Sequence, residues 1–144
     1  MKIENILLDK SLKPKLSDFS YAVVVVHNSE TGELVMSKTF CGSIPYLPPE
    51  ILSGKSYNPI IADIWSLGIC LFVMVNDGLP FKITNPTELM QKQMNREFKF
   101  KPRIEKKGVS KELKDVISKL IEPETSHRIT CQELLSHTWV QKAL

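Results

Sequence analysis

CGSIPYLPPE, residues 41–50, is the stretch at which this sequence changes from strands and loops to helices. Its three prolines fix the backbone φ angle and remove backbone donors, so they exclude a regular helix before Glu50. Beyond the stretch, apolar residues recur at helical spacing from about residue 62 to residue 75. The sequence therefore predicts a mainly helical second half, joined through an ordered loop to a first half that contains short strands.

The sequence before this stretch predicts a small hairpin and one more strand. Two short apolar runs, residues 6–8 and 12–16, flank a turn. Pro14 in the second run favours an edge position, because proline has no N–H to donate to a neighbouring strand. The β-branched run at residues 22–26 predicts a further strand. From there to Glu50 we expect a long ordered loop.

Helix start signals divide the sequence after this stretch into several helices. Asn85 stands before a proline, which predicts a helix that runs to about Asn95. Ser110 predicts the N-cap of another helix, whose apolar face covers residues 113–121. The sequence TCQE at 130–133 is a capping box, and it predicts a last short helix.

The composition is that of one globular domain. The chain has 144 residues, of which 42% are hydrophobic and 24% charged, and such fractions are typical of globular rather than disordered chains. Lysine and arginine exceed aspartate and glutamate by only 19 to 16. This thinly spread net charge of +3 argues against a dedicated nucleic-acid or anionic-membrane surface.

Cysteine spacing and hydropathy favour a cytoplasmic protein. The three cysteines lie far apart and form no C-x-x-C pair, so neither a disulfide framework nor a zinc site is indicated. The apolar run 60–75 is shorter than the roughly 20 residues of a membrane-spanning helix. It also carries Asp63, so we expect a buried core helix. No apolar run follows the basic start of the chain, so a secretory signal is not predicted.

Five motifs follow one another along nearly the whole chain. They are KIEN at 2–5, DFS at 18–20, CGSIPYLPPE at 41–50, DIWSLG at 63–68, and the closing pair HRIT at 127–130 and HTWV at 137–140. In this order they resemble the signatures of the eukaryotic serine/threonine protein kinase family, from the end of its catalytic loop onward. The strings KTFCGS, DIWSLG and LSHTWV also resemble the testis-specific serine kinase group. One motif alone would be weak, but five in order identify a member of this family.

The resemblance implies an α+β, mainly α fold, the C-terminal lobe of a protein kinase. It divides 1–144 into the catalytic-loop end and metal-site hairpin at 1–20, the activation segment at 21–50 and a helical subdomain at 51–144. The implied activity is transfer of the ATP γ-phosphate to serine or threonine of a protein. The expected partners are therefore protein substrates or regulators, with no nucleic acid and no membrane.

The resemblance also assigns a cofactor site. Asn5 and Asp18 would be the two oxygen ligands of Mg²⁺, which prefers such donors, and Lys2 would contact the transferred phosphate of ATP. Ser43 occupies a position whose hydroxyl bonds the catalytic aspartate and lysine, so it joins Lys2 as a catalytic residue. Taken singly, Lys2, Asn5 and Asp18 are ordinary surface or turn residues. Their mutual spacing is what favours the functional interpretation.

Other residues would have structural roles. Glu50 and Arg128 stand where the family has a buried ion pair between the activation segment and the late helices. Asp63 stands where the family bonds the backbone of its H-R-D triplet. Ser20 replaces the usual glycine after DF, and serine is less suited than glycine to a positive φ angle.

Thr39 is the candidate regulatory residue. It lies two residues before Cys41, where the resemblance places an activating phosphothreonine, and such a phosphate orders its loop by pairing with an arginine. A solvated loop threonine is the alternative interpretation. Ser37 and Thr31 are weaker candidates for the same modification.

Only Met1 precedes Lys2, so several kinase parts are missing from the 144 residues. These are the N-terminal lobe with its glycine-rich loop and ATP-binding lysine, the helix before the catalytic loop, and the H-R-D triplet with the catalytic aspartate. We therefore expect this truncated chain to be inactive alone and to bind Mg²⁺ and ATP weakly or not at all.

Two alternatives stand beside this expectation. One is a non-catalytic, pseudokinase-like interaction module that binds kinase substrates or regulators. The other is a partial gene model of a complete enzyme. In the truncated chain the apolar residues between 67 and 75 would be left open to a covering partner. Asp63 would have to reach water or a new partner.

Overall fold

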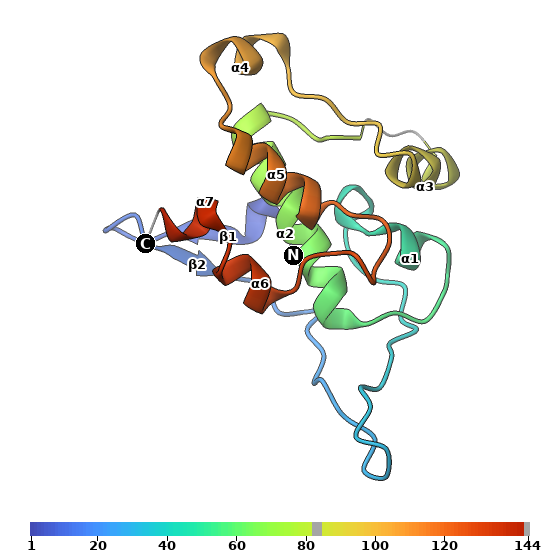
Figure 1. The fold of residues 1–144 in the computed structure, drawn as a ribbon. Coiled ribbons are helices and arrows are strands. Elements are labelled where there is room, and N and C mark those ends of the chain that lie inside the picture. The colour runs from blue at the N-terminus through green and yellow to red at the C-terminus, as the bar shows by residue number, and fades with distance from the viewer. Residues whose placement is uncertain (82–84, 143–144) are drawn as a thin grey trace.

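Helices make up most of the regular secondary structure in this computed structural model, which describes residues 1–81 and 85–142 (Figure 1). The expected α+β, mainly α fold is confirmed, with one two-stranded sheet in the described part of the chain. In chain order the elements are the 3-10 helix η1 (Ile3–Asn5), β1 (Ile6–Leu8), β2 (Pro14–Leu16), the 3-10 helix η2 (Ile44–Tyr46), α1 (Pro49–Leu52), α2 (Pro59–Asn76), α3 (Pro86–Met94), α4 (Pro102–Lys107), α5 (Lys111–Leu120), α6 (Cys131–Leu135) and α7 (Thr138–Gln141).

The predicted hairpin is confirmed. Strands β1 and β2 pair antiparallel, with Ile6 opposite Leu16 and Leu8 opposite Pro14. With only two strands in the sheet, each strand is an edge, so Pro14 can sit where no donor is needed. The hairpin joins η1 to the segment that follows Leu16, which brings residues from both ends of the hairpin together.

The strand predicted at residues 22–26 is wrong. This stretch carries no strand, and the nearest pairing is an isolated bridge between His27 and Leu34. The valines of the run are exposed, with Val24 at 85% of its full accessible surface. β-branched residues favour strands through packing against paired neighbours, and here no described strand lies beside them.

Helix α2 runs through the centre of the molecule (Figure 1). It begins three residues earlier than predicted, because the Asn58 side chain accepts from the backbone N–H of Ile60 and Ile61 and Pro59 is suited to the first helical position. Its length and composition would allow it to cross a membrane, but half of it is buried inside the protein. Trp65 and Ile69 have no accessible surface, so the predicted core helix is confirmed.

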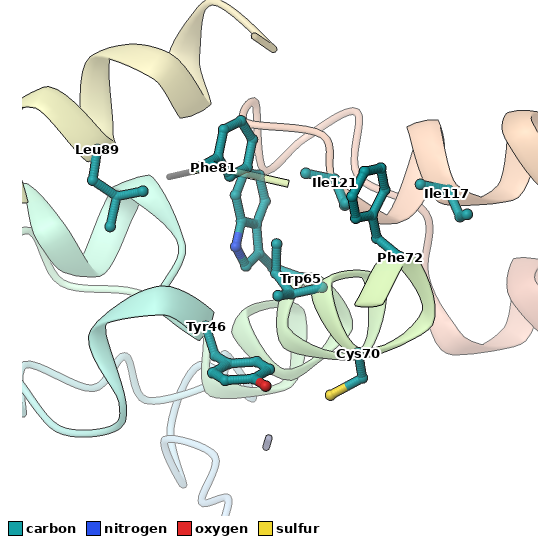
Figure 2. Packing of buried hydrophobic residues seen from close by; sticks show 9 residues of the cluster. Tyr46, Trp65, Cys70, Phe72, Phe81, Leu89, Ile117 and Ile121 are labelled. Carbon is teal, nitrogen blue, oxygen red and sulfur yellow. The ribbon is translucent and has the colours of Figure 1, made fainter. Parts of the chain in front are cut away.

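The main core gathers around α2 (Figure 2). Trp65 stacks on Phe81, with ring centroids 6.2 Å apart and planes 8° from parallel. Phe72, seven residues further along α2, packs edge to face against Phe98, with ring centroids 5.6 Å apart. Aromatic pairs at such spacings add to the free energy gained from burial alone. Phe81 and Phe98, one before and one after α3 in sequence, are thereby held against α2.

Gly68 lies where α2 packs closely against the end of α5. A Cβ atom at this position would lie 2.7 Å from Leu120 Cβ and 2.9 Å from Ile121 Cγ1. We expect Gly68→Ala to lower the free energy of unfolding by about 1–3 kcal/mol from overpacking, offset by about 1 kcal/mol of better helix propensity. Urea unfolding followed by circular dichroism measures the net loss. Met74→Ala, at an exposed position of the same helix, is the control, and stabilisation by Gly68→Ala would refute the close approach.

The helices predicted from capping signals are confirmed. Asn85 accepts from two backbone N–H groups at the start of α3, Ser110 caps α5, and the capping box of Thr130 with Glu133 opens α6. Helix α1 begins at Pro49, one residue before the predicted limit, because proline is tolerated in the first turn. Helices α4 and α7 were not predicted, and each has six residues or fewer.

Candidate functional site

The hairpin brings Asn5 and Asp18 together. Asn5 is the last residue of η1, and its carbonyl oxygen accepts from the Ser17 N–H at 2.9 Å. This bond fixes the second strand end beside η1. The Asn5 side-chain Nδ2 then donates to Asp18 Oδ2 at 3.3 Å. Two predicted metal ligands that are 13 residues apart in sequence are therefore in contact.

Asp18 is held as a carboxylate. Ser20 donates twice to Asp18 Oδ1, from its hydroxyl at 2.6 Å and from its N–H at 3.2 Å. The Ser20 hydroxyl first, then the Ser20 N–H and the Asn5 amide, hold the pKa of the Asp18 carboxyl below its ordinary value. The positive charge of Lys2 acts in the same direction. Asp18 is thus negatively charged at neutral pH.

Ser20 does not have the positive φ angle that would make serine less suitable than glycine at this position. The positive φ angle of this turn, 61°, belongs to Asp18, and Ser20 is not among the residues with positive φ. Aspartate tolerates this region better than most residues because its short side chain can bond locally. Serine in place of glycine therefore costs no backbone strain here, and its hydroxyl supplies the strongest bond to Asp18.

Lys2 and Ser43 are not joined by a hydrogen bond within the described residues. Ser43 precedes η2, where its carbonyl oxygen accepts from the Tyr46 N–H at 2.9 Å. It lines a cavity of about 330 Å³ whose wall also includes Met1 and Asp63. Ser43 thus faces the start of the chain, while Lys2 acts on Asp18 through its charge.

The donor set of this site suits Mg²⁺. The ionised Asp18 and the amide oxygen of Asn5 are hard oxygen donors, and Mg²⁺ commonly takes one or two protein oxygens while waters and ligand phosphates fill the other positions. The described residues include no group of three or more His, Cys, Asp or Glu side chains that could hold a metal ion by themselves. A metal at Asn5 and Asp18 would therefore complete its shell with waters and the phosphate oxygens of a ligand.

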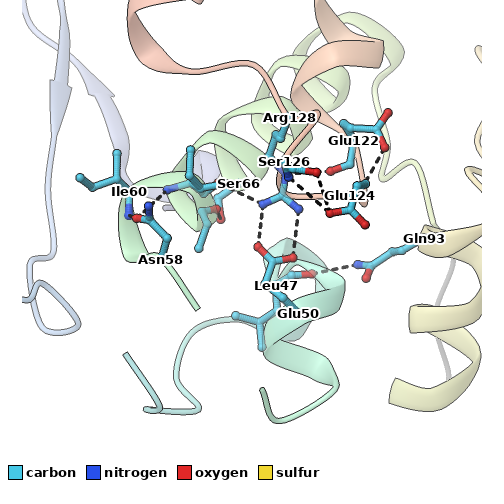
Figure 3. Close-up of polar contacts among 12 residues, drawn as sticks. Leu47, Glu50, Asn58, Ile60, Ser66, Gln93, Glu122, Glu124, Ser126 and Arg128 are labelled. Atoms are coloured by element: carbon cyan, nitrogen blue, oxygen red, sulfur yellow. Dashed lines mark hydrogen bonds and ion pairs between the residues drawn. The ribbon is translucent and has the colours of Figure 1, made fainter. Parts of the chain in front are cut away.

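Glu50, in the first turn of α1, forms an ion pair with Arg128 (Figure 3). Arg128 Nη1 donates to Glu50 Oε1 at 2.6 Å and Nη2 donates to Oε2 at 3.0 Å. The Arg128 side chain has no accessible surface and that of Glu50 has 11%. Arg128 also donates to the carbonyl oxygens of Ile61 and Glu122. This two-bond pair joins the segment after η2 to the chain between α5 and α6.

Asp63 and Thr39 both lie at the surface. The Asp63 side chain is 69% exposed, and its carboxylate lies 3.8 Å from the Met1 amino group. The Thr39 side chain is exposed, while its carbonyl oxygen accepts from the Tyr57 hydroxyl at 2.8 Å. The three arginines of the sequence are each paired with a carboxylate. A regulatory phosphate on Thr39 stays a prediction, as does one on Ser37 or Thr31.

Comparison with known proteins settles the family. Residues 1–140 match the protein kinase domain. The chain belongs to the protein kinase family. It is 40% identical over 141 residues to testis-specific serine/threonine-protein kinase 1 of Mus musculus, a match that covers 98% of the chain and 38% of that relative.

Two further relatives are plant and slime-mould kinases. The chain is 38% identical over 144 residues to probable serine/threonine-protein kinase MARK-B of Dictyostelium discoideum, covering 99% of the chain and 19% of that protein. It is 38% identical over 143 residues to CBL-interacting protein kinase 26 of Oryza sativa, covering 99% of the chain and 27% of that protein. The resemblance to serine/threonine kinases, the testis-specific group among them, is confirmed. The chain spans less than two fifths of the length of these relatives.

One contact of this kinase-family chain was missed from the sequence. The Tyr46 hydroxyl donates to Glu4 Oε2 at 3.3 Å, and the Tyr46 carbonyl oxygen accepts from the Ser66 hydroxyl at 3.0 Å. Burial first, then the charge of Glu4, raise the pKa of Tyr46. Tyr46, the last residue of η2, thus links η1 through Glu4 to α2 through Ser66. Glu4 and Tyr46 are 42 residues apart, and neither residue type carries a spacing signal.

Proposed function

We propose that a protein of the relatives' length that contains this chain transfers the γ-phosphate of ATP to serine or threonine residues of proteins. The contact between Asn5 and Asp18, with Lys2 close enough to act on the Asp18 carboxylate, carries the proposal. Membership of the protein kinase family supports it. The chain's share of the reaction would be the metal and phosphate side of the active site.

Each side chain of the site has a distinct task in this proposal. Phosphoryl transfer is catalysed mainly by positioning and by neutralising charge on the transferred group. Mg²⁺, when bound, would supply that neutralisation. Asp18 and Asn5 Oδ1 would hold the metal, and the Asn5 and Ser20 hydrogen bonds would keep Asp18 oriented. The Lys2 ammonium would face the transferred phosphate, and Ser43 would contribute from the neighbouring cavity that it lines with Met1 and Asp63.

The 144 residues alone are proposed to be inactive. They include no glycine-rich loop and no H-R-D aspartate, so the acceptor hydroxyl has no orienting carboxylate and the nucleotide has only one wall. Nucleotide binding tests this proposal directly. A ligand at 100 times its dissociation constant stabilises a native protein by about 2.7 kcal/mol, so Mg-ATP should leave the unfolding temperature of this chain unchanged.

The decisive experiment compares radiolabel transfer by the longer protein with transfer by its Asp18→Asn variant. Removing the charge that would hold the metal should lower the rate on the order of 10²–10³-fold, the size of effect seen when one stabilising group is lost. Asp9→Asn, in the turn of the same hairpin, is the matched control. Equal rates for Asp18→Asn and the unaltered protein would refute the assignment. Transfer by the 144 residues alone, abolished by Lys2→Ala, would refute their inactivity.

A non-catalytic interaction module is the second candidate. The exposed apolar side chains beside the site favour it, with Phe19 at 69% and Tyr21 at 68% of their full accessible surface, because exposed apolar patches mark interaction sites. The same experiment separates the two candidates. A longer protein that retains a protein substrate without labelling it, equally well with Asn or Asp at position 18, would favour the module over the enzyme.

A further inference from the structure

Positive charge is concentrated in one segment of this chain. Residues 99–114 contain seven lysines and arginines but two glutamates, a local charge of +5. The rest of the chain then holds twelve basic and fourteen acidic residues, a charge of −2. The small total of +3 is therefore the sum of two parts of opposite sign. The expectation that the chain has no dedicated nucleic-acid or anionic-membrane surface stays a prediction, but the net charge alone does not reveal this local concentration of positive charge.

The acidic groups of the region are already engaged. Glu105 pairs with Lys114 at 2.6 Å, and Glu112 pairs with Lys142 at 2.6 Å. Asp77, at the end of α2, pairs with Lys101 and Arg103.

Four cations of the segment 99–114 have no ion pair with any described residue. They are Lys99, Lys106, Lys107 and Lys111, which we call the basic surface, and all four are exposed.

The basic surface belongs to a segment with fixed backbone, and helix α4 of this segment lies at one end of the molecule (Figure 1). The Lys101 N–H donates to Asn76 Oδ1 at 2.7 Å, which anchors the segment just after Lys99 to the end of α2. The Glu105–Lys114 pair then joins α4 to α5. A partner would therefore meet charges that are already positioned, with little ordering of the chain needed on binding.

A role in folding explains only half of the basic surface. Lys106 and Lys107 form the last turn of α4, where the helix dipole favours cations. Lys111 is the first residue of α5, where the dipole disfavours them. Lys99 lies outside any helix. Helix stability thus gives no reason for the latter two charges.

We propose that the basic surface binds an acidic segment of a partner protein. Lysine is a point charge that can pair with the carboxylates of such a segment, and Arg103, whose planar fork would bind a phosphate with two bonds, is occupied by Asp77. Single-stranded nucleic acid would need exposed aromatic side chains for stacking, and a membrane surface would need exposed apolar ones. The described structure has no large exposed hydrophobic residue between Met94 and Leu135. An acidic peptide needs neither.

The test measures fluorescence anisotropy of a labelled peptide of alternating aspartate and glutamate on the 144-residue chain. The probe variant changes the four lysines of the basic surface to glutamate. The matched control changes Lys10, Lys13, Lys38 and Lys55, which are also exposed and without an ion pair among the described residues. Each exposed charge pair contributes only modestly to binding, but the four contributions add. We therefore expect the probe variant to bind the peptide about tenfold more weakly. The control variant should lose far less.

Three results would overturn the proposal. Equal loss in both variants would show that only total charge matters. Tighter binding of single-stranded DNA, or of phosphatidylserine vesicles, than of the acidic peptide would assign the surface to those ligands. Unchanged peptide binding in the probe variant would remove the basic surface from the interaction. If the probe variant unfolds, Lys106→Glu with Lys107→Glu replaces it, and the control becomes Lys10→Glu with Lys13→Glu.

Discussion

Replacing Glu50 by alanine is expected to lower the free energy of unfolding by about 3–5 kcal/mol, the usual result of removing one partner of a buried ion pair. The guanidinium of Arg128 has no accessible surface and would lose both bonds to the carboxylate. Its remaining acceptors, the carbonyl oxygens of Ile61 and Glu122, carry no full charge to balance it. Urea unfolding followed by circular dichroism gives the value.

Glu105→Ala is the control for this change. It removes a pair of similar length with Lys114, but both side chains are at least 40% exposed, and exposed pairs contribute about 0–1 kcal/mol. The comparison separates burial from ion pairing as such. If Glu50→Ala costs no more than Glu105→Ala, the Glu50–Arg128 pair does not hold the two halves of the chain together.

Trp65→Ala is expected to cost about 3–5 kcal/mol, the range for emptying a large aromatic site in a core. Trp65 is fully buried in α2, stacks on Phe81, and lies under the Arg128 guanidinium, whose Cζ is 5.1 Å from the ring centre. Its removal leaves a cavity next to a buried charge. Thermal unfolding monitored by circular dichroism measures the effect.

Trp65→Phe distinguishes the role of the ring from that of its nitrogen. The Trp65 Nε1 atom has no hydrogen-bond partner among the described residues, so phenylalanine gives up no bond and should recover much of the loss. If phenylalanine is as damaging as alanine, an unseen polar contact of Nε1, rather than ring packing, stabilises this position.

The elements that could be predicted are those whose signals are local. The side chains of Asn85, Ser110 and Thr130 each accept from a backbone N–H no more than three residues away. The local sequence is therefore enough to predict where these helices start. The strand at 22–26 failed because its stability depends on a neighbouring strand that the sequence does not specify. Helix α4 was missed because six residues give too little periodicity to detect.

The same contrast between local signals and long-range contacts applies to the residues of the candidate site. Asn5 and Asp18 could be proposed because family motifs fix their spacing, and the hairpin that brings them together is itself local. The Tyr46–Glu4 bond spans 42 residues and depends on how η2 docks on α2. The cation-rich segment at 99–114 was visible in the sequence, but only to a count made segment by segment.

The partners in the Glu50–Arg128 bond are separated by 78 residues, and this distance has a consequence during protein synthesis. Domains can fold while the ribosome is still synthesising the chain. The Glu50–Arg128 ion pair, however, cannot form until Arg128 has left the ribosomal exit tunnel. A nascent chain stalled before that residue carries Glu50 with only water as its partner. Because the tunnel still holds the most recently added residues, the Glu50–Arg128 bond forms only after the helical half has been synthesised.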